Sequence, residues 1–195
     1  MVLLDAASPD TESALALAWQ MSGVFLTQTL IAFAQHPGIV LLYAAPPATE
    51  RAWVLLRSKP IPAWWLPSME GLVAIWRLLL CAVALWVVLT PVQIAFLRGA
   101  LTSSATFQAA LDTFSENVNK GPDPLLWELA FFLAVFFLLN WLLSLIAHFW
   151  IEAPDLEQER RENQRLALAA VVRNLLLIPL ALIYVAVVVR HIFFV

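Results

Sequence analysis

The residues best suited to chemistry lie on the most apolar stretch of the chain, residues 127–151. Asn140, Ser144 and His148 are spaced by four, so they share one face of a helix. Polar side chains inside a membrane usually face other helices or a cavity rather than lipid. We therefore expect this stripe to make hydrogen bonds between helices. The alternative is that His148 ligates the metal of a haem or a chlorophyll-type pigment, with Ser144 leaving room one turn away.

The run SLIAH, residues 144–148, is loosely similar to the turn of a small residue followed by histidine in light-harvesting antenna helices. This resemblance implies a cofactor-binding role for His148, in place of a packing role. It covers these residues alone and implies nothing for the rest of the chain.

Two arginines, Arg77 and Arg173, stand inside otherwise apolar segments, each about eight residues from one end and so at a depth of ~12 Å. An arginine at the middle of a membrane costs about 2.5–3.5 kcal/mol on insertion scales, and less near the interface. Both side chains either extend to lipid phosphates or hold an anionic lipid, a cofactor carboxylate or an acid of a partner subunit. Ser144 lies at a similar depth, so we expect Arg173 to approach Asn140, Ser144 or a ligand between helices.

We predict no catalytic residues and no metal site. The three histidines, His36, His148 and His191, fall at different depths of the predicted membrane segments. Neither a glycine-rich phosphate loop nor a nucleophile elbow nor a zinc motif occurs in the sequence. The one cysteine, Cys81, excludes a disulfide within the chain.

The composition indicates that lipid surrounds most side chains. Hydrophobic residues make up 62% of the 195 residues, and charged residues only 13%, against about 25% in soluble domains. Between Glu128 and Glu152 the chain has no charge, and a helix of this length measures ~35 Å, enough to cross a ~30 Å hydrocarbon core. The sequence therefore predicts an all-α integral membrane protein with a single domain, residues 1–195.

About four transmembrane helices are predicted, at residues 14–36, 69–97, 127–151 and 166–190. The first carries polar residues, including Gln28, that we expect on a packing face, and it stops where Pro37-Gly38 breaks the helix. Its alternative is a helix that lies in the membrane interface or dips into it. We expect Pro91 to kink the second helix and Pro179 to bend the fourth.

The segments between the spans predict the orientation. The proline-rich connector 46–68 and the amphipathic segment 100–120 are expected along the membrane surface, and residues 155–165 as a helical turn in water. Most basic residues outside the spans gather in segments 46–69 and 152–165, which places both on the cytoplasmic side. The residues concerned are Arg51, Arg57, Lys59, Arg160, Arg161 and Arg165.

These observations favour a non-catalytic accessory or scaffold subunit of a larger membrane complex. Its expected partners are other membrane subunits and bilayer lipids with anionic headgroups. The net charge of −3 gives no indication of nucleic-acid binding. The first alternative is a cofactor-binding subunit of an electron-transfer or photosynthetic complex that uses His148. The second is a small transporter or membrane enzyme, which would need a line of ionisable groups across the membrane.

Overall fold

The computed structural model describes residues 9–57, 62, 65–119, 122–150 and 158–194. Every regular element in these ranges is helical, as predicted. In chain order the elements are α1 (Pro9–Gln35), α2 (Pro37–Leu56), α3 (Leu66–Val88), α4 (Pro91–Thr102), α5 (Ser104–Asn119), α6 (Pro122–Trp150), α7 (Gln158–Val172), the π-helical turn η1 (Arg173–Leu177) and α8 (Ile178–Phe194). Predicted positions 155–157, in the expected helical turn in water, lie outside the described residues.

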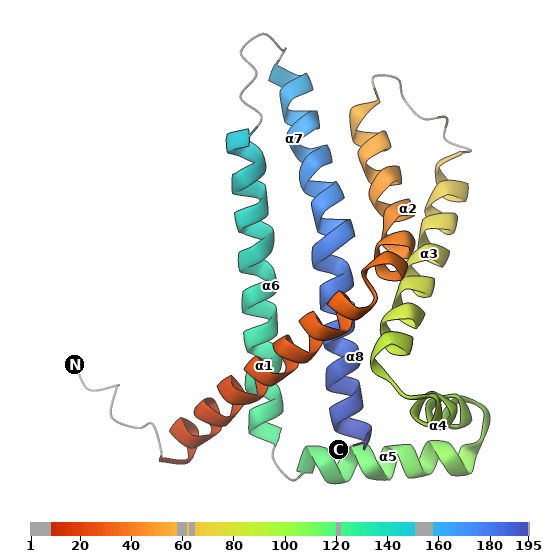
Figure 1. Cartoon of the computed structure of the whole chain (residues 1–195), viewed down its shortest axis with the longest axis vertical. Helices are drawn as coiled ribbons and strands as arrows, with labels where there is room; N and C mark the ends of the chain where they lie inside the picture. Colours follow the sequence, from red (N-terminus) through yellow and green to blue (C-terminus); the bar gives the residue numbers. More distant parts are fainter. Residues whose placement is uncertain (1–8, 58–61, 63–64, 120–121, 151–157, 195) are drawn as a thin grey trace.

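Three helices are long and apolar enough to cross a membrane: Pro67–Val88, Ala130–His148 and Arg160–Phe194. The third of these comprises α7, η1 and α8, which run as one continuous helix (Figure 1). The pair α1–α2 makes a fourth crossing if it is counted as one broken span. The structure thus holds three to four apolar helices that could span a membrane.

Helices α1 and α2 meet at a bend of 90°. The bend falls at His36, where Pro37 starts a new helix, because proline provides no N–H for the preceding turn and its fixed φ suits a first helical position. Figure 1 shows α1 beginning near the level of α5 and crossing obliquely in front of α6 and α8 before α2 turns upward. The predicted span 14–36 is therefore an oblique helix that is followed, after the bend, by α2.

Helix α2 corrects the prediction of a surface connector at residues 46–68. The helix continues through Pro46 and Pro47 to Leu56, although these prolines remove the N–H groups that would donate to the carbonyls four residues earlier. Pro47 is buried, and α2 packs along α3 and α7. Packing of the helix therefore outweighs the local effect of proline, as is tolerated where neighbouring helices surround a membrane segment.

The predicted span 69–97 is two helices rather than one kinked helix. Helix α3 ends at Val88, and Thr90 caps α4: its hydroxyl accepts from the Gln93 N–H at 3.4 Å, and the Gln93 side chain accepts from the Thr90 N–H at 2.9 Å. This reciprocal cap, followed by Pro91 at the first helical position, begins a helix rather than bending one. The expected amphipathic helix is confirmed as α5, which lies across the end of the bundle (Figure 1).

The long helix passes Pro179 by widening one turn. Pro179 has no N–H to donate to the carbonyl of Leu175, and in the turn before it the Ile178 N–H donates to the Arg173 carbonyl, five residues back. The wider turn η1 thus accommodates the proline, where the sequence suggested a bend. It also begins at Arg173, one of the two arginines singled out above.

The core is built largely from small side chains at helix crossings. Ala44 of α2, Ala84 of α3 and Ala186 of α8 are all at most 3% exposed, and Ile183 and Val187 lie beside them. Small residues let helix backbones approach closely, which is how apolar helices gain packing energy in the absence of water. Across this core, the Arg190 guanidinium donates to Gln28 Oε1 at 2.7 Å and ties α8 to α1.

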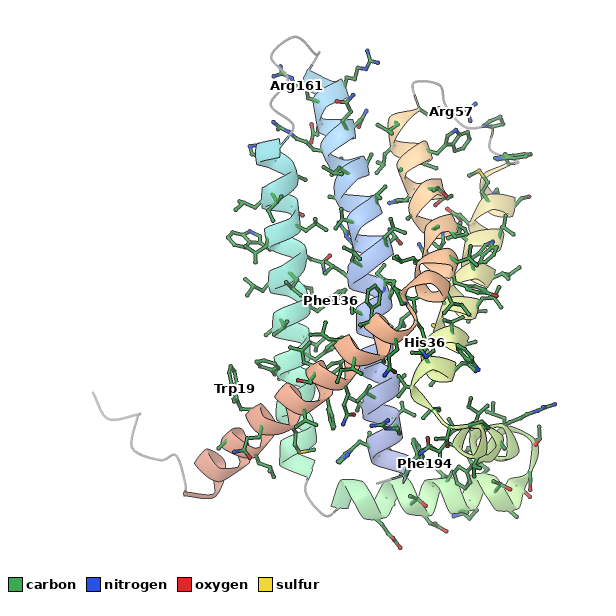
Figure 2. The ribbon with its side chains drawn as sticks, in the orientation of Figure 1. Trp19, His36, Arg57, Phe136, Arg161 and Phe194 are labelled. Carbon is green, nitrogen blue, oxygen red and sulfur yellow. The ribbon has the colours of Figure 1, made fainter. Side chains whose placement is uncertain are left out.

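The basic helix ends gather at one end of the bundle. Arg57 caps the end of α2 and lies 4.8 Å from the ring centroid of Trp53, and Arg161 lies in the first turn of α7 at the same end (Figure 2). We call this the basic end. Helices α4 and α5 and the C-terminus lie at the opposite end, which we call the far end (Figure 1).

Candidate functional site

A cavity of about 540 Å³ lies between α6 and α7 near the basic end. Three arginines, one histidine and one glutamate supply its charged and titratable side chains, and the remaining lining is small or apolar. We call it the arginine cavity. It is lined by Ser144, Ala147, His148, Arg161, Glu162, Arg165, Leu166, Ala169 and Arg173.

The three arginines lie on one face of the continuous helix formed by α7 and η1. Arg161, Arg165, Ala169 and Arg173 recur every four residues, so their side chains follow one another along the side of the helix turned toward α6. At a rise of ~1.5 Å per residue this row is about 18 Å long. It therefore leads from the basic end down to the level of Ser144.

Helix α6 supplies the opposite wall, and two side chains of its polar stripe form hydrogen bonds within the helix. Asn140 Nδ2 donates to the Phe136 carbonyl at 2.8 Å, and the Ser144 hydroxyl donates to the Asn140 carbonyl at 3.0 Å. The expected hydrogen bonds between helices are thus replaced, for these two side chains, by bonds to the preceding turn. Asn140 lies beyond the cavity lining, whereas Ser144 and His148 belong to it.

His148 contacts Arg165, with 3.1 Å between Nδ1 and the guanidinium Nη1. A guanidinium can only donate, so in this contact Nδ1 accepts, and the proton of the neutral ring lies on Nε2. Metal ligation through Nε2 needs that nitrogen without its proton. The haem or chlorophyll hypothesis for His148 stays a prediction.

The structure brings together some of the predicted site residues and separates others. Arg173, Ser144 and His148 line one cavity, whereas Asn140 does not, and the approach of Arg173 to the α6 stripe or to a ligand stays a prediction. Arg77 does not line this cavity; it is an exposed residue of α3. The two arginines that the sequence paired by depth therefore belong to different surfaces.

Sequence reasoning missed Arg161 and Arg165 as site residues. The sequence predicts residues 155–165 as the water-exposed first turns of a long helix, and their arginines enter only the prediction of orientation. Their signal was the four-residue spacing that continues from Arg161 through Arg165 and Ala169 to Arg173. A basic stripe that extends from water into an apolar helix is unusual, because a spanning helix rarely places a charge toward lipid.

Two other cavities have a different character. One of about 110 Å³ lies between α1, α6 and α8 and is lined by apolar and aromatic side chains such as Phe132 and Tyr184, with Thr29 as its polar residue. Another of about 490 Å³ lies between α3, α4, α5 and α8 and is wholly lined by apolar residues, Phe107 and Phe114 among them. In the described part of the chain no three histidine, cysteine or acidic side chains gather as metal ligands would. The arginine cavity is therefore the best candidate for binding a polar ligand.

No protein-family model, curated protein or solved structure matches this chain.

Proposed function

We propose that this chain is a non-catalytic integral membrane subunit that binds an anionic group in the arginine cavity. The observation that carries the proposal is the row Arg161, Arg165 and Arg173 beside His148, at one end of two helices that could span a membrane. Large apolar side chains on the outside of the helices support the membrane environment: Leu78 is 70% exposed, Phe137 68% and Trp86 53%. Water disfavours so much exposed apolar surface on a monomer, whereas lipid does not.

The charge of the lining favours an anion. Among the described lining residues, three arginines and one glutamate give a net charge of +2. Guanidinium groups that face one cavity repel one another, and a bound anion removes that repulsion. Arginine also binds phosphate and carboxylate through two parallel hydrogen bonds, which makes it the preferred partner for oxyanions.

Inorganic phosphate is expected to stabilise the purified protein against heat in detergent, when compared with chloride at equal ionic strength. A ligand that binds only the folded state raises its stability by RT ln(1 + [L]/Kd). The double variant Arg161→Gln, Arg173→Gln should lose this stabilisation, because it removes two of the three cationic groups of the cavity. The measurement is the shift in Tm as phosphate is titrated.

Arg160→Gln provides the matched control. Arg160 precedes Arg161 on the same helix and is exposed, but it does not line the cavity. Its substitution removes one positive charge near the cavity, half the change in the double variant, and should leave the phosphate-dependent shift in place. Equal shifts in the wild type, the control and the double variant would show that phosphate acts elsewhere, and the proposed anion site would then be wrong.

A role as a subunit of a larger complex is supported by the sparse packing of α6. Only 6% of its most apolar stretch is buried, against 17% in α3 and 28% in the continuous helix formed by α7, η1 and α8. Apolar helices in a membrane associate through close packing, since lipid tails are as apolar as their side chains. Helix α6 has little such packing within its own chain, and its outer face is available to another subunit.

A photoreactive phenylalanine analogue at Phe137 or Trp141 is therefore expected to cross-link to another polypeptide in native membranes. Both side chains are exposed on α6, at 68% and 60%. The matched position is Leu78 on α3, also 70% exposed, where we expect lipid adducts alone. The products are identified by mass spectrometry. Only lipid adducts at both α6 positions would contradict the role as a subunit.

A further inference from the structure

We infer that the anion of the arginine cavity is the headgroup of an anionic phospholipid, with a phosphomonoester favoured over a phosphodiester. This inference rests on the proposed function, because it names the ligand class of the same cavity. Its first support is position. The cavity lies between two helices that could span a membrane and at their basic end, so its arginines lie where lipid headgroups meet these helices.

The second support is the change of lining with depth. Arg161, Glu162 and Arg165 lie in the first turns of α7, while Leu166, Ala169 and Ala147 line the cavity between them and Arg173. Next to Arg173 along the helix, the exposed side chain of Leu176 begins an apolar surface. A soluble anion would need only the cationic groups. A phospholipid needs cationic groups beside apolar surface, because its glycerol and acyl chains adjoin its phosphate.

The third support is charge matching. Among the described residues of the lining, three arginines and one glutamate give a formal net charge of +2. A phosphomonoester carries about −1.5 to −2 at neutral pH, whereas a phosphodiester carries a single negative charge and a zwitterionic headgroup carries none in total. The phosphomonoester therefore comes closest to neutralising the cavity.

The spacing of the three arginines along the helix also suits a lipid headgroup. Arg173 lies about 18 Å along the helix from Arg161, so the guanidinium groups meet a ligand from different heights rather than in one plane. A lipid phosphate at the level of Arg165 has cationic groups above it and below it. Arg173 lies about 12 Å along the helix from Arg165, so it attracts such a phosphate through its charge rather than through direct contact.

The test uses the full chain, delipidated in detergent and then titrated with phospholipids while native mass spectrometry counts the bound lipids. Dioleoyl phosphatidic acid is expected to bind about tenfold tighter than dioleoyl phosphatidylcholine, since hydrogen bonds to charged groups contribute that much. Phosphatidylglycerol should fall between them. The double variant Arg161→Gln, Arg173→Gln should bind the three lipids alike, and Arg160→Gln should keep the wild-type order.

A pair of leucine variants separates a lipid from a free phosphate. Leu166 and Leu168 are both exposed on α7, at 49% and 36%, but only Leu166 lines the cavity. Leu166→Asn is expected to weaken phosphatidic acid several-fold, because its apolar contact with the lipid is lost, while the stabilisation by inorganic phosphate stays unchanged. Leu168→Asn should change neither.

The outcomes separate the two proposals. Retained stabilisation by inorganic phosphate, together with equal affinities for phosphatidic acid and phosphatidylcholine, would overturn the lipid inference and leave the anion site standing. Loss of both responses in the wild type would overturn the anion site as well. Preference for phosphatidic acid that depends on Arg161, Arg173 and Leu166, but on neither Arg160 nor Leu168, would establish the inference.

Discussion

Replacing Ala44 by phenylalanine is expected to lower the free energy of unfolding by about 3 kcal/mol, the upper part of the usual range for overpacking a core. Ala44 is 0% exposed and lies with Val40 and Ala48 on the face of α2 that is buried by neighbouring helices. The space that a methyl group fills there cannot take a ring unless α2 moves away from the helices it packs along, α3 and α7. The measurement is unfolding by SDS in mixed micelles, followed by circular dichroism.

Ala74→Phe is the matched control for this substitution. Ala74 is exposed on α3, so a ring at this position extends outward and should change the unfolding free energy by less than about 0.5 kcal/mol. Equal destabilisation by the two variants would mean that the buried face of α2 is not a close helix contact. An unchanged Ala44→Phe protein would mean that α2 does not pack where the structure places it.

The packing of α2 also shows why part of the fold was not predictable from the sequence. Pro46 and Pro47 read locally as the end of a helix and the start of a connector. What keeps them helical is the contact of α2 with α3 and α7, and no local pattern encodes that contact. By contrast, α6 and the continuous helix formed by α7, η1 and α8 were predictable, because long uncharged segments have few alternatives to a spanning helix.

The sequence contains the signal for the break between α3 and α4, but the prediction of one kinked helix was wrong. Thr90, Pro91 and Gln93 form the pattern of an N-cap, a proline at the first helical position and an N3 side chain that bonds back to the cap. Pro91 considered alone predicts a kink. In an apolar segment, the residue before a proline and the residue two positions after it decide between a bend and a new helix.

Part of the candidate site could be predicted from the sequence. Periodicity identified Ser144, His148 and Arg173, since polar residues within an apolar span stand out and their spacing gives their face. The sequence does not show which helices pack together, so Arg77 and Arg173 were grouped by depth although they belong to different surfaces. Only the packing of α7 against α6 shows that Arg161 and Arg165 share a cavity with Arg173.

Labelling of single cysteines is expected to place Arg57 and Glu116 on opposite sides of the membrane. With Cys81 replaced by serine, a membrane-impermeant thiol reagent should reach Arg57→Cys from the cytoplasm and Glu116→Cys only from the other side. The reason is that the basic end carries the arginines of α2 and α7, and basic connectors remain cytoplasmic. Both native side chains are exposed, Arg57 at the end of α2 and Glu116 on α5 at the far end, so accessibility is decided by the side alone.

Ala16→Cys then decides how the bent pair α1–α2 crosses the membrane. Ala16 is exposed near the start of α1, which begins near the level of α5 (Figure 1). We expect it to be labelled from the same side as Glu116→Cys, because α1 and α2 together then make one broken span from the far end to the basic end. Labelling from the same side as Arg57→Cys would make the pair a re-entrant loop and leave three crossings. The 90° bend at His36 fits either path, so the side on which α1 begins is what separates them.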